Sequence, residues 1–451
     1  MIDLGDVREQ FRESKVRRVK LCAADMDGVL RGKWISTEKF TSMVESTSGF
    51  CDVVFGWDIA DALYDNVKYT GWHTGYPDAS FRVDLQTFRI IPWEPGTALF
   101  LLDFVTGDSQ PLGIAPRQVF QRVLDRAEKM GYVPKFSAEY EFFIFRETAE
   151  SVREKHFANL TPITPGMFGY SILRASGNSE ILIEMLTQLE AFGVPVEGLH
   201  TETGPGVFEA AIAVDEGMRA ADRAILFKTA VKELAGRHGL LPTFMAKCNP
   251  KLPGSSGHLH QSLWQRSSPY DTNLFSTDEA GCIGAVMQQY IAGLVANMPE
   301  LMACFCPTVN SYKRTVPGAW APINATWGID NRTTAVRAIP SAGNSGRVEL
   351  RLTGADINPY IAMAASLAAG LDGIERELPL PAPVVNAYTG DAPPLPRTLA
   401  EATRKLRESA MARKWLGDEF VDHYAATREW EVRQFEEAVT DWELARYLES
   451  I

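Results

Sequence analysis

The chain has 451 residues, of which 45% are hydrophobic and 23% are charged. These proportions are typical of a soluble globular protein and exclude a largely disordered chain, and the length allows two or three domains. The formal net charge of −12 argues against nucleic acid or an anionic membrane as the main partner, because both attract basic surfaces.

The cysteine pattern and the first residues bear on the compartment. The six cysteines are scattered, and none has the CxxC or zinc-ligand spacing. This pattern is typical of reduced thiols in the cytosol. Residues 1–20 lack the apolar core of a signal peptide, and no run of 18 apolar residues occurs. We therefore expect a cytoplasmic protein that does not span a membrane.

Residues 1–110 predict a small domain that mixes helices and strands. Asp27-Gly28 supplies the turn of a hairpin, because glycine adopts a positive φ at little cost. A loop-rich stretch over 55–77 interrupts this region. The expected elements are a helix over 1–13, the hairpin over 19–35, a short helix over 37–47 and further strands near 80–105.

Residues 111–451 predict a larger second domain, in which strands alternate with long helices. Pro116 opens its first helix, over 116–130, because proline is favoured at the first helical position. The segment 379–396 carries six prolines and is expected to be a wrapped loop, followed by a polar helical tail over 398–450. The other expected helices are 178–192, 214–238, 276–297 and 358–376, and the expected strands are 136–145, 207–214, 241–247, 257–264, 335–340 and 347–352.

Two of these strands place chemically reactive side chains on one face. Side chains alternate between the faces of a strand, so Glu139 and Glu141 share a face, as do His258, His260 and Ser262. Adjacent carboxylates repel each other unless a cation lies between them or one is protonated. The glutamate pair by itself also fits an edge strand with its polar face in water. A Gly/Ser-rich loop precedes the histidines and could cradle an anion through its backbone amides.

A third strand and a glycine-containing turn add further charged groups. Arg347, Glu349 and Arg351 share one face of a strand that leads into an apolar helix. An exposed, ion-paired face would explain this pattern. The same face in the interior of a sheet would instead require bound anionic and cationic ligands. Glu202 precedes a Gly-Pro-Gly turn, and Glu209 follows it within the next expected strand.

Basic residues gather on the loop-rich segment 310–340, although the chain is acidic overall. Taken singly, each of Lys313, Arg314, Arg332 and Arg337 is best explained as a surface residue. Together with five glutamates and a histidine, they fit a different role. Oxygen-rich ligand sets with a single imidazole suit Mg²⁺ or Mn²⁺, and arginines beside such ions are typical of phosphoryl transfer. No P-loop, kinase or dinucleotide-binding motif is present.

The order of these segments resembles the glutamine synthetase family. The matching segments are SAEYEFFIF, HTETGPGVFE, GSSGHLHQSL, NSYKRTVPG, DNRTTAVR and RVELRLTGADINPY, and the resemblance as a whole extends over residues 20–375. The resemblance implies an α+β fold, with a small N-terminal β-grasp-like domain (1–110) and a large glutamine-synthetase-like catalytic domain (111–451) built on a curved antiparallel sheet. It also implies ATP and Mg²⁺ or Mn²⁺ as cofactors. Hexameric rings are implied too, stacked into a dodecamer, with each active site between neighbouring subunits.

The resemblance also assigns roles to individual residues. One metal ion would be bound by Glu141, Glu202 and Glu209, and the other by Glu139, His258 and Glu349. Glutamate would be held by Arg314, Arg351 and the backbone at Gly254, and Arg332 would stabilise the transferred phosphoryl group. The nucleotide would be lined by Glu197, His260, Ser262, Arg337 and Arg347.

Two departures from the family pattern affect the ammonium site. Ammonia-using members carry a glutamate after the Pro-Gly of the NSYKRTVPG segment, where this chain has Ala319 and Trp320. The family's Asp-Gly-Ser-Ser loop is replaced by VVFGWDIADALYDN (53–66). Similar substitutions are typical of γ-glutamylamine synthetases. Trp320 would line a pocket for an organic amine and Asp58 would meet a distal ammonium group, although Asp58 also fits the solvated face of a short helix.

The sequence therefore predicts an ATP-dependent ligase that joins the γ-carboxylate of L-glutamate to a primary organic amine through γ-glutamyl phosphate. The small-molecule partners would be glutamate, an amine and ATP. Two alternatives stay open: a glutamine synthetase that uses ammonium, and a non-catalytic family member that acts as a binding or regulatory protein.

Overall fold

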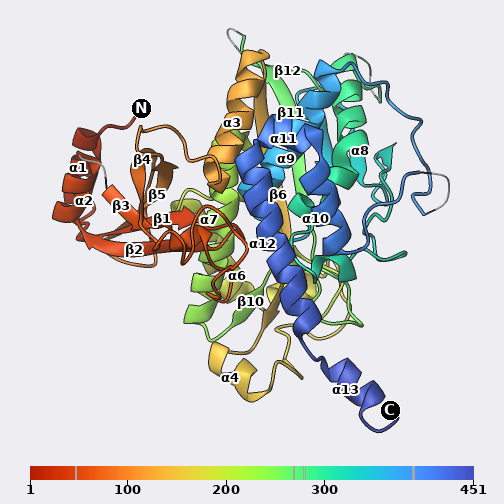
Figure 1. Cartoon of the computed structure of the whole chain (residues 1–451), viewed down its shortest axis with the longest axis horizontal. Helices are drawn as coiled ribbons and strands as arrows, with labels where there is room; N and C mark the ends of the chain where they lie inside the picture. The colour runs from red at the N-terminus through yellow and green to blue at the C-terminus, as the bar shows by residue number, and fades with distance from the viewer. Residues whose placement is uncertain (46–47, 268–269, 278, 280, 389–391) are drawn as a thin grey trace.

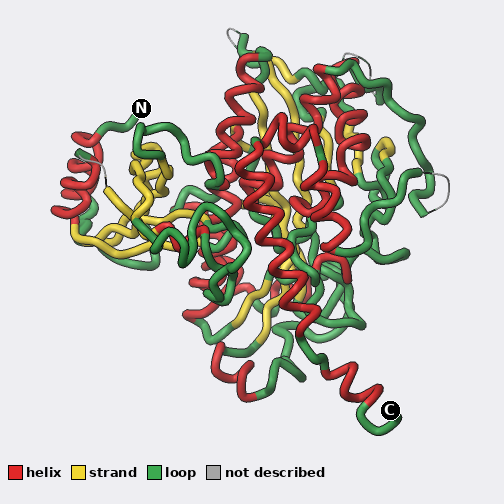
Figure 2. The backbone as a smooth tube through the Cα atoms, in the orientation of Figure 1, coloured by secondary structure: helices red, strands yellow, loops and turns green. Residues whose placement is uncertain are grey.

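The computed structural model describes residues 1–45, 48–267, 270–277, 279, 281–388 and 392–451. A small N-terminal unit, red to orange in Figure 1, lies beside a larger body built from the rest of the chain. Figure 2 shows that helices and strands are mixed in both parts, as the α+β expectation requires. Among the described residues, no helix is long and apolar enough to cross a membrane.

The N-terminal unit contains a five-stranded sheet in the order β2-β1-β5-β4-β3. β1 and β2 form the predicted antiparallel hairpin, and β1 runs parallel to β5. The hairpin turns at Gly28, whose φ of 76° is a conformation that glycine adopts most readily. The elements are α1 (Leu4–Glu13), β1 (Arg18–Ala24), β2 (Leu30–Ser36), α2 (Thr37–Val44), β3 (Ser48–Cys51), β4 (Asp78–Ile90) and β5 (Thr97–Val105).

The body is organised around a second sheet with the order β13-β14-β15-β11-β6-β8-β7. β9 and β10 pair with β6, and β12 pairs with β11. The pairing is antiparallel, as predicted, except between β13 and β14, which run parallel. The strands are β6 (Val133–Phe145), β7 (Val196–Thr201), β8 (Val207–Ile212), β9 (Asp215–Glu216), β10 (Leu241–Thr243), β11 (Gly257–Gln265), β12 (Thr272–Asn273), β13 (Trp327–Ile329), β14 (Val336–Ile339) and β15 (Arg347–Leu350).

Long helices pack along this sheet (Figure 1). α9 is buried at every position from Pro359 to Gly373, which explains its nearly all-apolar sequence. α8 differs from the predicted range of 276–297: it begins at Ala285 and continues through Pro299 to Phe305, because the residues beyond the proline are apolar and buried. Positions 278 and 280 of that range lie outside the described residues. The helices are α3 (Pro116–Lys129), α4 (Ala149–Glu154), α5 (Ile172–Ser176), α6 (Ser179–Ala191), α7 (Gly217–Arg237), α8 (Ala285–Phe305) and α9 (Pro359–Glu375).

The C-terminal segment is helical, as the sequence predicted, but most of it packs against the body and is not a polar tail. The helices α10 (Leu399–Glu408), α11 (Ala410–Leu416) and α12 (Asp418–Glu437) pack against the body and bury large side chains such as Trp415 and Tyr424. Their apolar stripes were missed because polar residues dominate the composition. Only α13 (Asp441–Tyr447) projects from the body and buries no residue (Figure 1).

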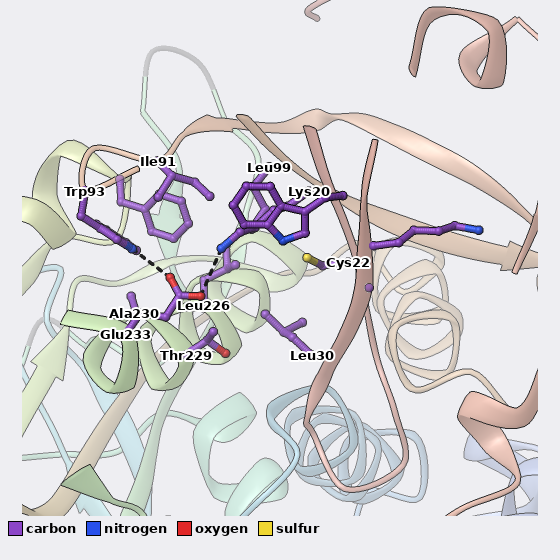
Figure 3. A pocket seen from close by; sticks show the side chains of 14 residues that line it. Lys20, Cys22, Leu30, Ile91, Trp93, Leu99, Leu226, Thr229, Ala230 and Glu233 are labelled. Carbon is purple, nitrogen blue, oxygen red and sulfur yellow. Dashed lines mark hydrogen bonds and ion pairs between the residues drawn. The ribbon is translucent and has the colours of Figure 1, made fainter. Parts of the chain in front are cut away.

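Polar contacts join the two parts of the chain. A cavity of about 200 Å³ lies between the N-terminal sheet and α7. In it, Glu233 accepts a hydrogen bond from Trp93 Nε1 at 2.8 Å and pairs with Lys20 at 3.3 Å (Figure 3). At the hairpin, the Asp27 carboxylate pairs with the buried Arg428 of α12 at 2.6 Å. These contacts fix the N-terminal sheet against the body.

Candidate active site

The charged side chains gather on one face of the central strands because of the strand register. Glu139 on β6 lies opposite His258 on β11, and Glu141 lies opposite Glu209 on β8. Glu349 on β15 lies opposite His260 on β11. The intervening Tyr140 faces the other side, where its ring stacks on Phe227 at 6.0 Å. One face of the sheet is therefore ionic, and the opposite face belongs to the core.

Distances between these groups define a cluster of potential metal ligands. His258 Nδ1 lies 3.2 Å from Glu139 Oε1 and 3.4 Å from Glu349 Oε1. Ligand atoms fall within 4.8 Å of one another in two groups, Glu139–Glu209–His258 and Glu139–His260–Glu349. Both groups contain Glu139. The structure thus brings together Glu139, His258 and Glu349, the set expected for one metal ion.

The second expected set is arranged differently. Glu141 and Glu209 are in register, but neither Glu141 nor Glu202 belongs to the two groups of close ligand atoms. Glu141 accepts a hydrogen bond from the Ser256 amide at 2.6 Å, and the Glu202 carboxylate accepts one from the Thr203 amide. Local backbone donors therefore hold both carboxylates at the edge of the cluster.

Electrostatics distinguish the carboxyl groups of the cluster. Burial raises the pKa of Glu139, but hydrogen bonds from His258 and His260 outweigh that effect and hold the pKa well below its usual range. Burial likewise acts on Glu349, yet the charges of His258 and Arg351 lower its pKa to about 2. Burial raises the pKa of Glu141, and the neighbouring Glu209 carboxylate adds to this effect. The carboxyl groups of the cluster therefore differ: the pKa is lowered at Glu139 and Glu349 and raised at Glu141.

The donor set fits divalent cations. His258 is 3% exposed, and its Nε2 is buried without a hydrogen-bond partner among the described residues. The other ring nitrogen, Nδ1, faces the Glu139 and Glu349 carboxylates, so Nδ1 is the atom that would join them around a cation. Carboxylate oxygens with one imidazole are the ligands that Mg²⁺ and Mn²⁺ accept.

Arg314 and Gly254 form a tight unit beside the cluster. Arg314 is 2% exposed and donates to Ser256 Oγ at 3.3 Å and to the Leu352 carbonyl. A Cβ atom at Gly254 would collide with Arg314 Cγ and lie 2.6 Å from the Ala246 carbonyl. The absent side chain at Gly254 thus leaves room for the guanidinium stem, which explains why glycine is suited to this position.

Two more arginines lie near the cluster: Arg332 in the loop before β14, and Arg351 directly after β15. Arg351 donates from Nε to the Arg332 carbonyl at 2.9 Å and pairs with Glu349. The Arg332 side chain is exposed and lines a cavity of about 650 Å³ together with Trp320. Trp320 is 66% exposed, so its indole ring is available to another molecule.

The residues expected at the nucleotide lie on β7, β11, β14 and β15. Arg347 donates to His260 Nδ1 at 3.2 Å, and Arg337 pairs with Glu349 at 2.9 Å. Ser262 accepts a hydrogen bond from Trp264 Nε1 at 2.9 Å. Glu197 is exposed at a bulge of β7, on the far side of the sheet order from β11. His260, Ser262, Arg337 and Arg347 form one strip of residues, and Glu197 lies apart from this strip.

Sequence reasoning missed His200 on β7. Its Nε2 lies 2.9 Å from Glu209 Oε1, and the hydrogen bond raises the pKa of His200 to about 9. Tyr170 stacks on the imidazole, with 4.4 Å between ring centroids. The alternation rule would have found this residue, because His200 and Glu202 are two positions apart. No strand was predicted there, so the rule was not applied.

Comparison with known proteins identifies the family. Residues 113–447 match the family model described as "Glutamine synthetase, catalytic domain". The chain belongs to the glutamine synthetase family. Ligases of this family use ATP and divalent metal ions, in keeping with the carboxylate cluster.

Named members of the glutamine synthetase family are similar over nearly the whole chain. "Type-1 glutamine synthetase 2" of Dictyostelium discoideum is 47% identical and covers 99% of this chain and 86% of that protein. "Glutamate--isopropylamine ligase" of a Pseudomonas species is 40% identical over 99% of this chain and 98% of that protein. The solved structure named "GmaS/ADP complex-Conformation 1" superposes with a TM-score of 0.86 at 28% identity, covering 99% of this chain and 100% of that one.

Within this glutamine synthetase fold, the two expected amine-pocket residues lie along different cavities. Trp320 lines the cavity that contains Arg332, whereas Asp58 lines one formed by the hairpin, α7 and α12. Asp58 is not on a helix: it accepts hydrogen bonds from the Ala60 and Ala62 amides and from Trp430 Nε1. A single chain therefore does not bring Trp320 and Asp58 into one pocket.

Proposed function

We propose that this member of the glutamine synthetase family joins the γ-carboxylate of L-glutamate to a primary organic amine, at the expense of ATP. The carrying observation is the placement of Trp320, which is 66% exposed and lines the same cavity as Arg332. The Arg332 carbonyl accepts a hydrogen bond from Arg351, which pairs with Glu349 of the carboxylate cluster. An indole ring offers apolar surface to the carbon chain of an amine and offers no carboxylate to an ammonium ion. The similarity to a glutamate–isopropylamine ligase supports this choice of substrate.

In this proposal, each group of residues binds one substrate, cofactor or metal ion. Glu139, His258 and Glu349 hold one divalent cation, and Glu141, Glu202 and Glu209 hold the other. The bound cations would neutralise phosphate charge, and Arg332 adds a further positive charge at the edge of the site. Arg314 and Arg351 bind the carboxylates of glutamate beside Gly254. The strip His260, Ser262, Arg337 and Arg347, with Glu197 across the sheet, lines the nucleotide.

The reaction has two balanced steps. The γ-carboxylate of glutamate attacks the γ-phosphorus of ATP, which forms γ-glutamyl phosphate and releases ADP. The amine nitrogen then attacks the acyl carbon, phosphate leaves, and the nitrogen loses a proton to give the γ-glutamylamide. Activation as an acyl phosphate replaces one unfavourable condensation with two feasible steps.

A glutamine synthetase that uses ammonium is the second candidate. It is favoured by the 47% identity to a protein named as a glutamine synthetase. The loop around Trp320 argues against it, because Ala319 and Trp320 offer no side-chain carboxylate to bind and deprotonate ammonium.

We also propose that the enzyme works as stacked hexameric rings. Trp320 and Asp58 line different cavities within one chain, and a shared amine pocket would require the Asp58 loop of one subunit to face Trp320 of its neighbour. Mass measurement of the purified protein in solution tests this assembly, and a monomeric active enzyme would contradict it.

The function is tested by measuring phosphate release that depends on ATP and glutamate across a panel of amines. The panel contains ammonium, isopropylamine and other short alkylamines, ethanolamine, aromatic amines, putrescine and spermidine, with mass spectrometry of the products. The proposal expects one organic amine to give a kcat/KM at least about tenfold above that of ammonium. Preference for ammonium would establish the second candidate, and no turnover with any amine would favour a binding role.

A further inference from the structure

One arginine of the N-terminal unit holds the Asp58 loop, which consists of residues 57–63. Arg31 lies on β2, and its side chain is 18% exposed. Its Nη1 atom pairs with the Asp61 carboxylate at 2.6 Å, and its Nη2 atom donates to the Asp58 carbonyl at 3.3 Å. The guanidinium carbon lies 5.0 Å from the centre of the Trp57 ring. A single side chain therefore contacts three residues of this loop.

The same guanidinium group is anchored in the hairpin. Arg31 Nε donates to the Asp25 carboxylate at 2.8 Å, and Asp25 is 2% exposed. The Asp25 carboxylate also accepts hydrogen bonds from the amides of Asp27 and Val29 at 3.0 and 2.9 Å, which shape the hairpin turn. The Asp25 carbonyl accepts a hydrogen bond at 2.9 Å from the side chain of Asn358, at the N-terminus of α9. Arg31 thus connects the Asp58 loop with a turn that is attached to the body.

The Asp58 loop adopts a conformation that needs support from its surroundings. Asp61 has a φ of 63°, which is uncommon for residues other than glycine. Residues in such conformations persist where the surrounding structure holds them in place. Within the loop, Asp58 Oδ1 accepts hydrogen bonds from the amides of Ala60 and Ala62 at 2.8 and 2.9 Å. The position of the Asp58 carboxylate therefore depends on the same turn that Arg31 holds through Asp61.

An exposed ion pair just beyond the loop provides an internal comparison. Arg433 of α12 pairs with Asp65, and the two side chains are 41% and 63% exposed. Exposed ion pairs contribute little to stability, because water and salt screen their charges. Arg31 differs, since it is largely shielded and its partner Asp25 is buried. Loss of the Arg31 contacts should therefore disturb the Asp58 loop more than loss of the Arg433 pair would.

We propose that Arg31 is a positioning residue for the amine: it fixes the Asp58 loop in the arrangement in which this loop meets Trp320 of a neighbouring subunit. The inference rests on the proposed function, in which Asp58 and Trp320 share one amine pocket between subunits. The contacts of Arg31 described above lie at the hairpin and in the Asp58 loop. A change of Arg31 should therefore act on the amine and leave the binding of ATP and glutamate unchanged.

Steady-state kinetics of two variants of the full-length enzyme test this role. Arg31→Lys keeps a positive charge beside Asp25, but an ammonium group lacks the fork with which the guanidinium binds several partners together. Asp61→Asn removes the charge of the loop partner, and asparagine tolerates the positive φ. We expect each variant to raise the KM for the preferred amine about tenfold, with the KM values for ATP and glutamate within about twofold. Because both substitutions break the same contact, the double variant should add little to the effect of Arg31→Lys alone. Asp65→Asn, which breaks the exposed pair, is the matched control and should leave all three KM values unchanged.

Hydrogen–deuterium exchange of the free protein tests the same contact without turnover. In Arg31→Lys and Asp61→Asn, the amides of residues 57–63 should exchange at least about tenfold faster, while those of β6 exchange as in the parent protein. Unchanged exchange of residues 57–63 in both variants would overturn the proposal, as would equal changes in all three KM values. A preference for ammonium over every organic amine would contradict only the proposed function, and the KM for ammonium would then decide the role of Arg31.

Discussion

His258 and Glu139 lie directly opposite each other on β11 and β6, and His258 Nδ1 is 3.2 Å from Glu139 Oε1. The other imidazole nitrogen of His258 stays buried without a partner in the described structure. Strand register therefore holds His258 Nδ1 against the carboxylates of Glu139 and Glu349. The register of β6 and β11 thus brings together two of the side chains proposed to bind one metal ion.

Replacement of Glu141 tests the proposed metal set. Glu141→Gln removes a carboxylate charge, keeps the shape of the side chain and preserves the acceptor for the Ser256 amide. We expect kcat/KM to fall about 100-fold or more and Mn²⁺ binding, measured by calorimetry, to weaken. The exposed Glu180→Gln serves as control and should behave as the parent protein. Full activity in Glu141→Gln would show that Glu141 has no role in catalysis.

Trp320 should affect the amine more than the other substrates. Trp320→Ala removes an indole ring that is 66% exposed at the cavity containing Arg332. Loss of this apolar surface should raise the KM for the preferred amine about tenfold, with the KM values for ATP and glutamate within about twofold. Tyr270→Ala, at an exposed aromatic residue outside that cavity, is the matched control. Equal changes in all three KM values would assign Trp320 a structural role instead.

Gly254 should not accept a side chain. In Gly254→Ala, the new Cβ would meet Arg314 Cγ and the Ala246 carbonyl, so Arg314 must move. The expected result is a KM for glutamate raised about tenfold and a loss of about 1–3 kcal/mol in the free energy of unfolding. Gly236→Ala is the control, because nothing lies within 4 Å of its Cβ. That helical substitution should be neutral or add about 0.5–1 kcal/mol of stability.

The buried His423 of α12 should make stability depend on pH. Burial lowers the pKa of His423 to about 4, below the value of about 6.5 expected in the unfolded chain. The unfolded state therefore binds the proton more readily, and stability falls as the pH decreases from about 6.5 towards 4. Between pH 7 and pH 5 the loss attributable to this group is about 2 kcal/mol. His423→Gln should flatten the dependence of Tm on pH over this range, whereas the exposed His73→Gln should not, and an unchanged slope in His423→Gln would contradict the assignment.

Much of the fold could be predicted because local patterns specified it. The β1–β2 hairpin follows from Asp27-Gly28, and α3 begins at Pro116 as predicted. Predictions failed where burial overrode a local rule. α8 runs through Pro299 because the residues that follow it pack in the core, and α10–α12 are packed helices although their composition is polar.

The sequence by itself determined which residues share a strand face, because alternation is a property of the extended backbone: Glu139 and Glu141, and His258 and His260, could be paired on this basis. Only the tertiary structure decided which strands are neighbours. Glu139 and His258 are 119 positions apart, and their contact depends on the register of β6 and β11.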